Sequence, residues 1–260
     1  MIPKYFDTHS HLQFFGFDED LAEVLGRMKE ESVSTVVVGT DKESSQKACD
    51  MISVKDGIFA AVGLHPNDAL KEEFSTSFYK TLAQKEGVVA IGECGIDLFR
   101  TKEWSEKELE KQKEVFMQHV ELGVELGKSL MIHCRDAHTE TTAILQEKKK
   151  IYGEKLFGNI HFFTGSLAEA NAYVELGFTI SFPGVITFTS DYDDVVRGLP
   201  LESILSETDC PFAAPVPYRG RRNEPIYVKE VVKKIAEIRG EDFEKVREVL
   251  VANAKRVFSV

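Results

Sequence analysis

Short runs of apolar and β-branched residues recur along the whole chain, and most are followed by a longer amphipathic segment. The composition and length of these runs suit strands. Eight such strands are predicted at Tyr5–His9, Thr35–Gly39, Ile58–Gly63, Val88–Glu93, Ser129–His133, Phe157–Phe162, Phe178–Ser181 and Ser203–Thr208. Several runs, including 35–39, are apolar on both faces, which is typical of parallel strands that helices cover on both sides.

The segments between and after these runs have apolar residues at helical spacing. They predict helices at Glu19–Glu30, Glu43–Ser53, Ser75–Lys85, Glu106–Leu126, Thr139–Lys150, Leu167–Leu176, Tyr192–Arg197, Pro225–Arg239 and Asp242–Ala252. Strands that alternate with helices at this spacing indicate βαβ units and a parallel sheet. We therefore expect an α/β protein with a (β/α)8 barrel of the TIM type, forming a single domain over residues 1–260. An open, doubly wound sheet is the alternative.

Composition narrows the class of protein. Hydrophobic residues make up 43% of the chain, which is enough for a sizeable core. No segment reaches the roughly 20 apolar residues of a membrane span, and Met1–Lys4 does not begin a secretory signal. The four cysteines lack the spacing of a metal knuckle or a disulfide framework. We therefore expect a cytoplasmic protein with reduced thiols, monomeric by default and with no membrane or obligate protein partner.

The net charge of −11 argues against diffuse electrostatic binding of nucleic acid as a source of affinity. Recognition of an anionic substrate must then come from a local positive feature.

Candidate chemistry begins at the end of the first predicted strand. His9 and His11 are two residues apart on an extended segment, so their imidazoles point to the same side. Neutral imidazole is a good ligand for zinc and similar ions. Alone, the pair is a weak signal, because two histidines at this spacing also occur on surfaces by chance.

Four more potential ligands end other predicted strands. They are Glu93, His133, His161 and Asp209. In a (β/α)8 barrel the carboxyl ends of the strands surround one mouth, where active sites lie. The joint pattern is therefore much stronger than any single residue.

The ligand count predicts more than one ion. Four histidines and two carboxylates exceed the needs of one tetrahedral catalytic ion. They suit two divalent ions with a bridging carboxylate, and the imidazoles favour zinc, manganese, cobalt or iron over magnesium. Two divalent cations against two carboxylates leave a positive pocket that can attract phosphate, and paired ions are typical of phosphodiester hydrolysis.

The chain resembles the TatD family of metal-dependent deoxyribonucleases, within the amidohydrolase-like barrels. The resemblance is carried by Phe6–Leu12, Gly63–Pro66, Gly92–Asp97, Ile132–Arg135, His161–Gly165 and Glu207–Pro211, continuing through 215–225. These segments cover nearly the whole chain in the family's order. One departure is that Gly95-Ile96-Asp97-Leu98-Phe99 stands where the family has a more aromatic run.

The resemblance implies a nuclease or phosphoesterase that acts on DNA. It also implies that Glu93 bridges two ions, one of which is held by His9, His11 and Asp209. The other ion is expected on His133 and His161. All six positions are filled as the family's motif requires.

Asp209 is the predicted proton acceptor from the attacking water, and Glu93 is catalytic through its metals. Glu207 and Asp7 share a strand face with Asp209 and His9, respectively, and are candidates to orient ligands from behind. A buried structural acid is the alternative for Glu207. Asp97 is expected to organise the loop after Glu93.

The predicted substrate contacts are His65, Arg135, Tyr218 and Arg219. Tyr218 and Arg219 open the only dense basic run, which ends at Arg222 and follows Asp209 at the same mouth. Arginine forks match phosphate oxygens, and a tyrosine ring can stack on a base. A solvated charge run or an arginine paired with Glu224 is the alternative.

Other polar residues are expected to have structural roles. His119 falls at helical spacing with apolar neighbours, which indicates a packed histidine, and His138 begins a helix. Cys94, Cys134 and Cys210 each follow a predicted ligand, so strand alternation turns them toward the core.

The sequence is also compatible with two functions other than a nuclease. An amidohydrolase-type enzyme would act on a small amide, lactone or phosphoester, but Glu93 stands where such enzymes often carry a bridging carboxylated lysine. A non-enzymatic metal-binding scaffold is the third possibility. The leading expectation is hydrolysis of DNA phosphodiesters by a water that two metals activate.

Overall fold

A computed structural model describes residues 3–99 and 105–260 of the chain. Its eight strands form one sheet, in which each strand pairs with the next along the chain in parallel. The strands are β1 (Tyr5–Ser10), β2 (Val33–Val38), β3 (Ile58–Val62), β4 (Val88–Asp97), β5 (Ser129–Arg135), β6 (Gly158–His161), β7 (Thr179–Phe182) and β8 (Ile204–Ser206). The predicted TIM-type barrel is confirmed, and the open sheet is excluded.

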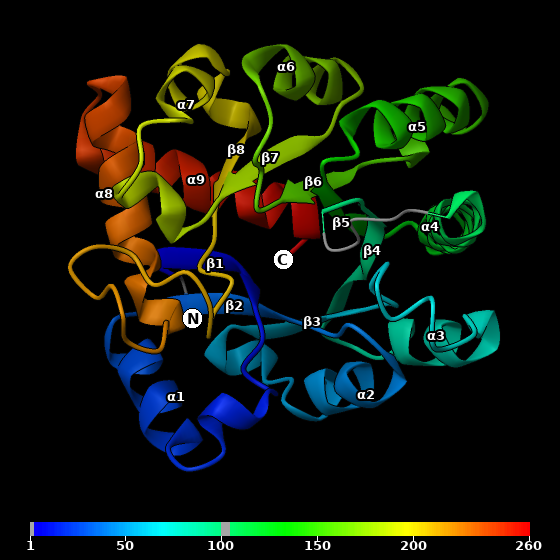
Figure 1. Ribbon diagram of the computed structural model, residues 1–260. Coiled ribbons are helices and arrows are strands. Elements are labelled where there is room, and N and C mark those ends of the chain that lie inside the picture. The colour runs from blue at the N-terminus through cyan, green and yellow to red at the C-terminus, as the bar shows by residue number, and fades with distance from the viewer. Residues whose placement is uncertain (1–2, 100–104) are drawn as a thin grey trace.

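Helices surround the strands as an outer ring, except that the C-terminal helix lies across one end of the barrel (Figure 1). They are α1 (Leu21–Glu30), α2 (Lys42–Asp50), α3 (Thr76–Ala83), α4 (Glu106–Leu126), α5 (His138–Tyr152), α6 (Leu167–Glu175), α7 (Asp193–Gly198), α8 (Val228–Arg239) and α9 (Phe243–Phe258). Short 3-10 turns, among them η1 (Phe15–Phe17) and η4 (Gly184–Thr187), lie in the loops.

Local sequence signals explain several helix ends. α4 begins with a capping box, in which Ser105 accepts from the amide of Glu108 and the Glu108 carboxylate accepts from Ser105. The helix ends at Gly127, whose φ of 62° is the left-handed conformation that glycine adopts at little cost. The predicted bounds of α4 therefore match the observed ones.

Some predicted bounds were wrong. α9 extends to Phe258, six positions past the predicted end at Ala252, because Val257 and Phe258 bury their side chains against the barrel. β8 ends at Ser206 rather than Thr208, since the chain leaves the strand before Asp209, whose φ is 53°. The predicted helix at 225–239 begins with a 3-10 turn over its first three residues.

Apolar side chains fill two layers. The larger core lies between the strands and the surrounding helices. A smaller cluster inside the barrel includes Phe6, Phe59 and Met131, and Phe258 of α9 packs against it. α9 thus closes one end of the barrel interior, which leaves the opposite end for polar side chains.

The barrel closes between β8 and β1 mainly through hydrogen bonds from side chains and loop backbone. The buried carboxylate of Asp7 accepts from the backbone amide of Thr208 at 2.7 Å and from its hydroxyl at 2.6 Å. The amide of Asp209 donates to the carbonyl of His9 at 2.9 Å. The closure therefore brings the first and last predicted metal ligands together.

A β-bulge in β4 sets the direction of Glu93. Ile91 and Cys94 both face the outer core although they are three residues apart, whereas their partners on β5, Leu130 and Ile132, are two apart. One extra residue in β4 accounts for this shift. The backbone is tight here, because a Cβ on Gly92 would lie 2.3 Å from the carbonyl oxygen of Met131.

His119 is a packed histidine, fully buried in α4. Its Nδ1 lies 2.7 Å from the carbonyl of Val115 and donates to it, while Nε2 accepts from the amide of Leu64 at 2.9 Å. Burial lowers the pKa of His119 to about 4, so the ring is neutral in the folded protein at pH 7.

This histidine should make the protein acid-sensitive. In the unfolded chain the histidine is protonated below about pH 6.5, whereas in the folded protein it is protonated only below about pH 4. Protonation between these values therefore favours the unfolded state. The stabilisation is complete above pH 6.5 and is lost as the pH falls through this window. In His119→Gln, which keeps an acceptor for Leu64, we expect lower stability at pH 7.5. The deficit relative to wild type should shrink by up to about 1.4 kcal/mol per pH unit between pH 6.5 and 4.5.

Urea unfolding of the two metal-free proteins at pH 7.5, 6.5, 5.5 and 4.5 measures this deficit. Both proteins share every other titrating group, so the comparison isolates His119. A deficit that stays constant with pH would contradict the assignment.

Candidate metal centre

Six polar side chains from five strands or their ends meet at the mouth of the barrel opposite α9. His9 and His11 come from β1 and the residue after it, Glu93 from β4, His133 from β5, His161 from β6 and Asp209 from the loop after β8. Five of them line a cavity of about 420 Å³, and the sixth, His9, is fully buried, with its Nε2 3.5 Å from Oε2 of Glu93. The sequence placed all six at strand ends, and the structure brings them together.

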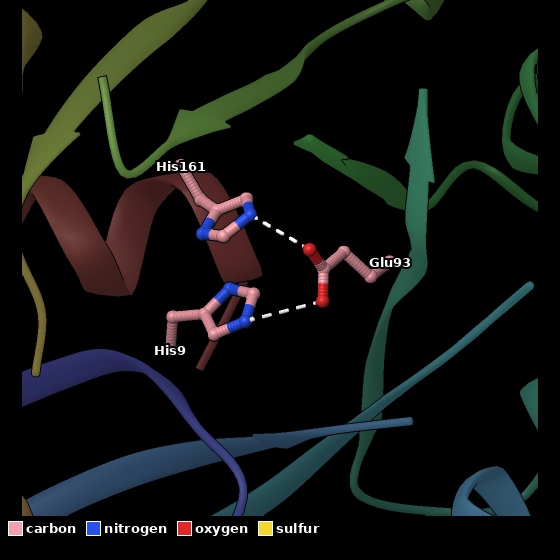
Figure 2. A group of neighbouring side chains, drawn as sticks. All are labelled: His9, Glu93 and His161. Carbon is pink, nitrogen blue, oxygen red and sulfur yellow. Dashed lines mark hydrogen bonds and ion pairs between the residues drawn. The ribbon is translucent and has the colours of Figure 1, made fainter. Parts of the chain in front are cut away.

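Glu93 lies at the centre of this group and is almost fully buried. Its Oε1 is 2.9 Å from Nδ1 of His133 and 2.8 Å from Nε2 of His161. Its Oε2 is 3.5 Å from Nε2 of His9 and 3.8 Å from Nε2 of His11. Figure 2 shows the two oxygens facing His161 and His9 separately. Each carboxylate oxygen therefore serves a different pair of histidines.

The histidines of the β1 end present Nε2 to the cavity. Nδ1 of His11 lies 2.8 Å from the carbonyl of Val38, which can only accept, so Nδ1 carries the proton and Nε2 has a free lone pair. That Nε2 is 3.2 Å from Nε2 of His9 and 3.4 Å from Oδ1 of Asp209. Three potential ligand atoms thus face one another, as around a shared cation.

Asp97 orients His133, and the sequence did not predict this role of Asp97. Its Oδ2 lies 3.2 Å from Nε2 of His133, while Oδ1 accepts from the amide of Phe99 at 2.9 Å. The predicted role in the loop is therefore only part of what Asp97 does. Because Nε2 donates to the carboxylate, Nδ1 of His133 keeps its lone pair toward Glu93 and His161. Asp97 lies four residues after Glu93 in β4, so strand alternation puts both side chains on the same face. This spacing could have indicated that Asp97 belongs to the site.

His161 has a similar support. Its ring stacks on that of His9, with centroids 3.9 Å apart, and its Nδ1 lies 3.6 Å from Oε1 of Glu207. Glu207 also accepts from the amide of Phe162 at 2.8 Å and from the hydroxyl of Ser181. Glu207 is thus positioned to orient His161, whereas Asp7 contacts the amide of His9 and the residue before Asp209.

Mutual attraction dominates the electrostatics of the group. Burial alone would raise the pKa of Glu93, but the surrounding histidines hold it well below its usual value. Burial likewise opposes the charged form of His161, but Glu93 and Glu207 raise its pKa well above the usual value. A buried carboxylate is costly unless positive charges surround it. Bound cations would supply such charges.

His65 projects from the end of β3 toward the same carboxylate. Its Nδ1 accepts from the amide of Asn67 at 3.2 Å, so the proton of the neutral ring sits on Nε2, which is 3.5 Å from Oε1 of Glu93. Burial lowers the pKa of His65 to about 3. The ring therefore offers an N–H donor to the cavity rather than a lone pair.

The other predicted substrate contacts lie in different places. Arg135 lines the cavity, and its guanidinium covers the ring of Phe99 at 3.7 Å. Tyr218 stacks on Tyr227 with centroids 3.8 Å apart, and Arg219 covers Phe188 at 3.7 Å. Tyr218 and Arg219 lie outside the described lining of the cavity.

Arg222 pairs with acidic side chains, including Glu224, which was the alternative expected for this basic run. It donates two hydrogen bonds of 2.6 Å to Asp20 and one of 3.2 Å to Glu224. A bidentate pair of this kind fixes the loop after β8 against the start of α1.

The cysteines that follow the ligands are buried in the outer core, where alternation put them. Burial raises the pKa of Cys134 to about 11, and its Sγ lies 3.2 Å from Nδ1 of His138. His138 begins α5 and also contacts the hydroxyl of Tyr173 at 3.1 Å, so it supports the back of β5.

Two aromatic residues at the cavity were also missed. Phe14 and Phe212 both line it, and Phe14 stacks on the ring of His11. Both are in loops without periodicity, so a sequence pattern gives little sign of their position.

The donor set fits metal ions. Three groups bring potential ligand atoms within 4.8 Å of one another: His9 with Glu93 and His161, His9 with His11 and Asp209, and His65 with Asp97 and His133. In the third group, both ring nitrogens of His133 and the carboxylate of Asp97 already take part in the hydrogen bonds described above. Imidazole and carboxylate ligands on a barrel mouth, with orienting acids behind them, define a metal-dependent hydrolase.

Comparison with known proteins agrees, and the chain belongs to the TatD family. The family model described as TatD related DNase matches residues 6–259. The uncharacterized metal-dependent hydrolase YabD of Bacillus subtilis (strain 168) is 41% identical over 259 residues, which cover 98% of this chain and 99% of that protein. The 3'-5' ssDNA/RNA exonuclease TatD of Cronobacter sakazakii is 33% identical over 270 residues, with 97% of each chain covered.

A solved structure gives the same result. The crystal structure of YJJV, a TatD homologue from Escherichia coli K12, superposes with a TM-score of 0.89 at 28% identity, covering 100% of both chains. The protein is therefore a metal-dependent hydrolase of this family. Among the described residues, no helix is both long and apolar enough to span a membrane.

Asp97 gives a prediction about metal affinity. Asp97→Asn removes the charge that orients His133 but keeps the size of the side chain. Loss of such a support typically costs about 10- to 100-fold in metal affinity. We expect that loss of affinity for an ion bound by His133, measured in a Mn²⁺ titration followed by calorimetry.

The matched control is Asp50→Asn, which changes an exposed carboxylate on α2 that accepts from Gln46. It should bind Mn²⁺ like wild type. Unchanged affinity in Asp97→Asn would show that the contact with His133 does not support a ligand.

Proposed function

We propose that the protein is a deoxyribonuclease that hydrolyses DNA phosphodiester bonds with two divalent ions. The observation that carries this proposal is the division of the Glu93 carboxylate between two pairs of histidines. A single tetrahedral ion with an open position needs three protein ligands, and this mouth offers twice that number.

The distances support one division of the ligands. His9, His11 and Asp209 would hold one ion with Oε2 of Glu93, and their facing atoms are 3.2 to 3.8 Å apart. His133 and His161 would hold the other with Oε1. Four imidazoles favour zinc, manganese, cobalt or iron over magnesium. When bound, such ions would supply positive charge that polarises the phosphate and lowers the pKa of water.

The protein's own residues would supply the remaining chemistry. The Asp209 carboxylate is 13% exposed toward the cavity and would accept the proton of the attacking water. The Nε2–H of His65 would donate to a phosphate oxygen, because Asn67 fixes that tautomer. Arg135 at the cavity wall adds a positive charge for the phosphate.

A nucleic-acid substrate is supported by the relatives. The protein from Cronobacter sakazakii bears the name of a 3'-5' ssDNA/RNA exonuclease, and the family model that of a DNase. We propose the same substrate class here, with cleavage from a strand end. Arg219 and Tyr218, outside the described lining of the cavity, would contact more distant nucleotides.

Substitution of Asp209 and Glu93 tests the proposal. We expect Asp209→Asn to lower kcat by about 10²- to 10⁴-fold, because the proton acceptor is lost. Glu93→Gln should lose cleavage together with metal binding. The measurement is release of nucleotides from a labelled single-stranded oligonucleotide with Mn²⁺, Mg²⁺, Co²⁺ or Zn²⁺.

The control is Glu43→Gln, an exposed α2 carboxylate paired with Lys47, which should retain full activity. If wild type cleaves no DNA with any of these ions, the nuclease assignment is wrong. Assays with a small amide, a lactone and a phosphomonoester would then show which other type of bond the enzyme hydrolyses.

A further inference from the structure

We propose that Phe14 and Phe212 form a platform on which an unpaired nucleobase stacks beside the metal centre. The proposal rests on the function proposed above and names the part of the substrate that these residues recognise. Phe14 lies in the loop after β1, and Phe212 lies in the loop after β8. Nothing in the sequence pattern distinguished either residue.

The two rings adjoin a predicted metal ligand. The ring of Phe14 stacks on His11, with centroids 4.6 Å apart and planes 4° apart. The ring of Phe212 meets Phe14 and His11 edge-on, at centroid distances of 6.4 and 6.3 Å. A base on this pair would lie next to a phosphate held at Asp209 and Glu93.

Phe212 leaves much of its ring exposed to solvent, beyond its edge contacts with Phe14 and His11. Its exposed fraction is 52%, although it lines a cavity with charged and imidazole side chains. Phe14 is half-buried beneath it. An exposed aromatic face beside a polar reaction centre is a suitable surface for a flat π system.

A second exposed aromatic residue, Phe188, lies in a loop that is hydrogen-bonded to the loop of Phe212. Phe188, which ends η4, is 41% exposed and is covered on one face by the guanidinium of Arg219 at 3.7 Å. Arg219 donates to the carbonyl of Ala214 at 3.5 Å, two residues from Phe212. The amide of Val216 donates to the hydroxyl of Thr187 at 2.9 Å, which joins the two loops. A strand leaving Phe212 would therefore reach a second stacking site.

Charge supports a single strand over a duplex. With a net charge of −11, the chain has little general attraction for a phosphate backbone. Beyond the phosphate bound at the metal centre, further affinity would come from contacts with the bases, and the bases of a duplex are already stacked on both faces. Stacking on aromatic rings is tolerant of sequence, so the platform selects strandedness rather than base identity.

The test compares two substrates in two proteins. One substrate is a 5'-labelled oligo-dT, and the other has the same length with abasic sites at its last three 3' positions. Wild type should have a lower KM for oligo-dT. Phe212→Ala should raise the KM for oligo-dT by about 5- to 100-fold, the range for one lost stacked base, while leaving the abasic substrate nearly unchanged.

Further variants separate stacking from other effects. Phe212→Trp should retain the preference for oligo-dT, and Phe212→Leu should lose it although it remains apolar. Phe15→Ala is the matched control, because Phe15 is 88% exposed in the same loop as Phe14 but borders a different groove. It should behave like wild type on both substrates.

Binding provides a readout that does not depend on cleavage. Fluorescence anisotropy with both oligonucleotides, in Mn²⁺, should show the same loss of preference in Phe212→Ala. If wild type binds oligo-dT preferentially but cleaves nothing, the platform stands and the nuclease function fails. If Phe212→Ala affects both oligonucleotides equally, or neither, the platform is wrong whatever the enzyme cleaves.

Discussion

The buried carboxylate of Glu93 is the constraint on which the rest of the site depends. It is nearly inaccessible to water and stays ionised because histidines from three strands surround it. To point there it requires the bulge in β4, and the bulge requires Gly92, since a Cβ would strike the neighbouring strand. The hydrogen bond between His133 and Asp97, and the contact of Glu207 with His161 at 3.6 Å, then orient the histidines that face it. One buried charge thus determines strand geometry and ligand orientation together.

The fold and the positions of the six candidate ligands could be predicted because both depend on strand ends. A polar residue that follows an apolar run in a parallel barrel must reach the same mouth. The bulge could not be predicted in this way, since it breaks the alternation on which such reasoning relies. Nor could the pairing of Asp97 with His133, which depends on how far β4 and β5 extend. Loop residues such as Phe14 and Phe212 are placed by contacts with other loops, so no local period reveals them.

The basic run after β8 shows how similar residues separate in function. Arg222 is held by Asp20 and Glu224 and anchors the loop, while Arg219 lies over Phe188 with its guanidinium exposed. Sequence reasoning saw only a cluster of positive charge. The structure distinguishes them by their partners, because the acids Asp20 and Glu224 lie beside Arg222 and an aromatic ring lies beside Arg219. The charge of Arg222 is therefore neutralised before a substrate arrives, whereas the guanidinium groups of Arg135 and Arg219 lie on aromatic rings.

The seam between β8 and β1 has a consequence for biosynthesis. Asp7 and Thr208, which join it, are 201 residues apart in the sequence. His9 emerges from the ribosome early, but its neighbour Asp209 is made only after all eight strands. A nascent chain therefore cannot complete this half of the centre until the barrel is nearly whole. Cation capture by these residues would report that translation has passed β8, so a truncated chain would lack the finished pocket.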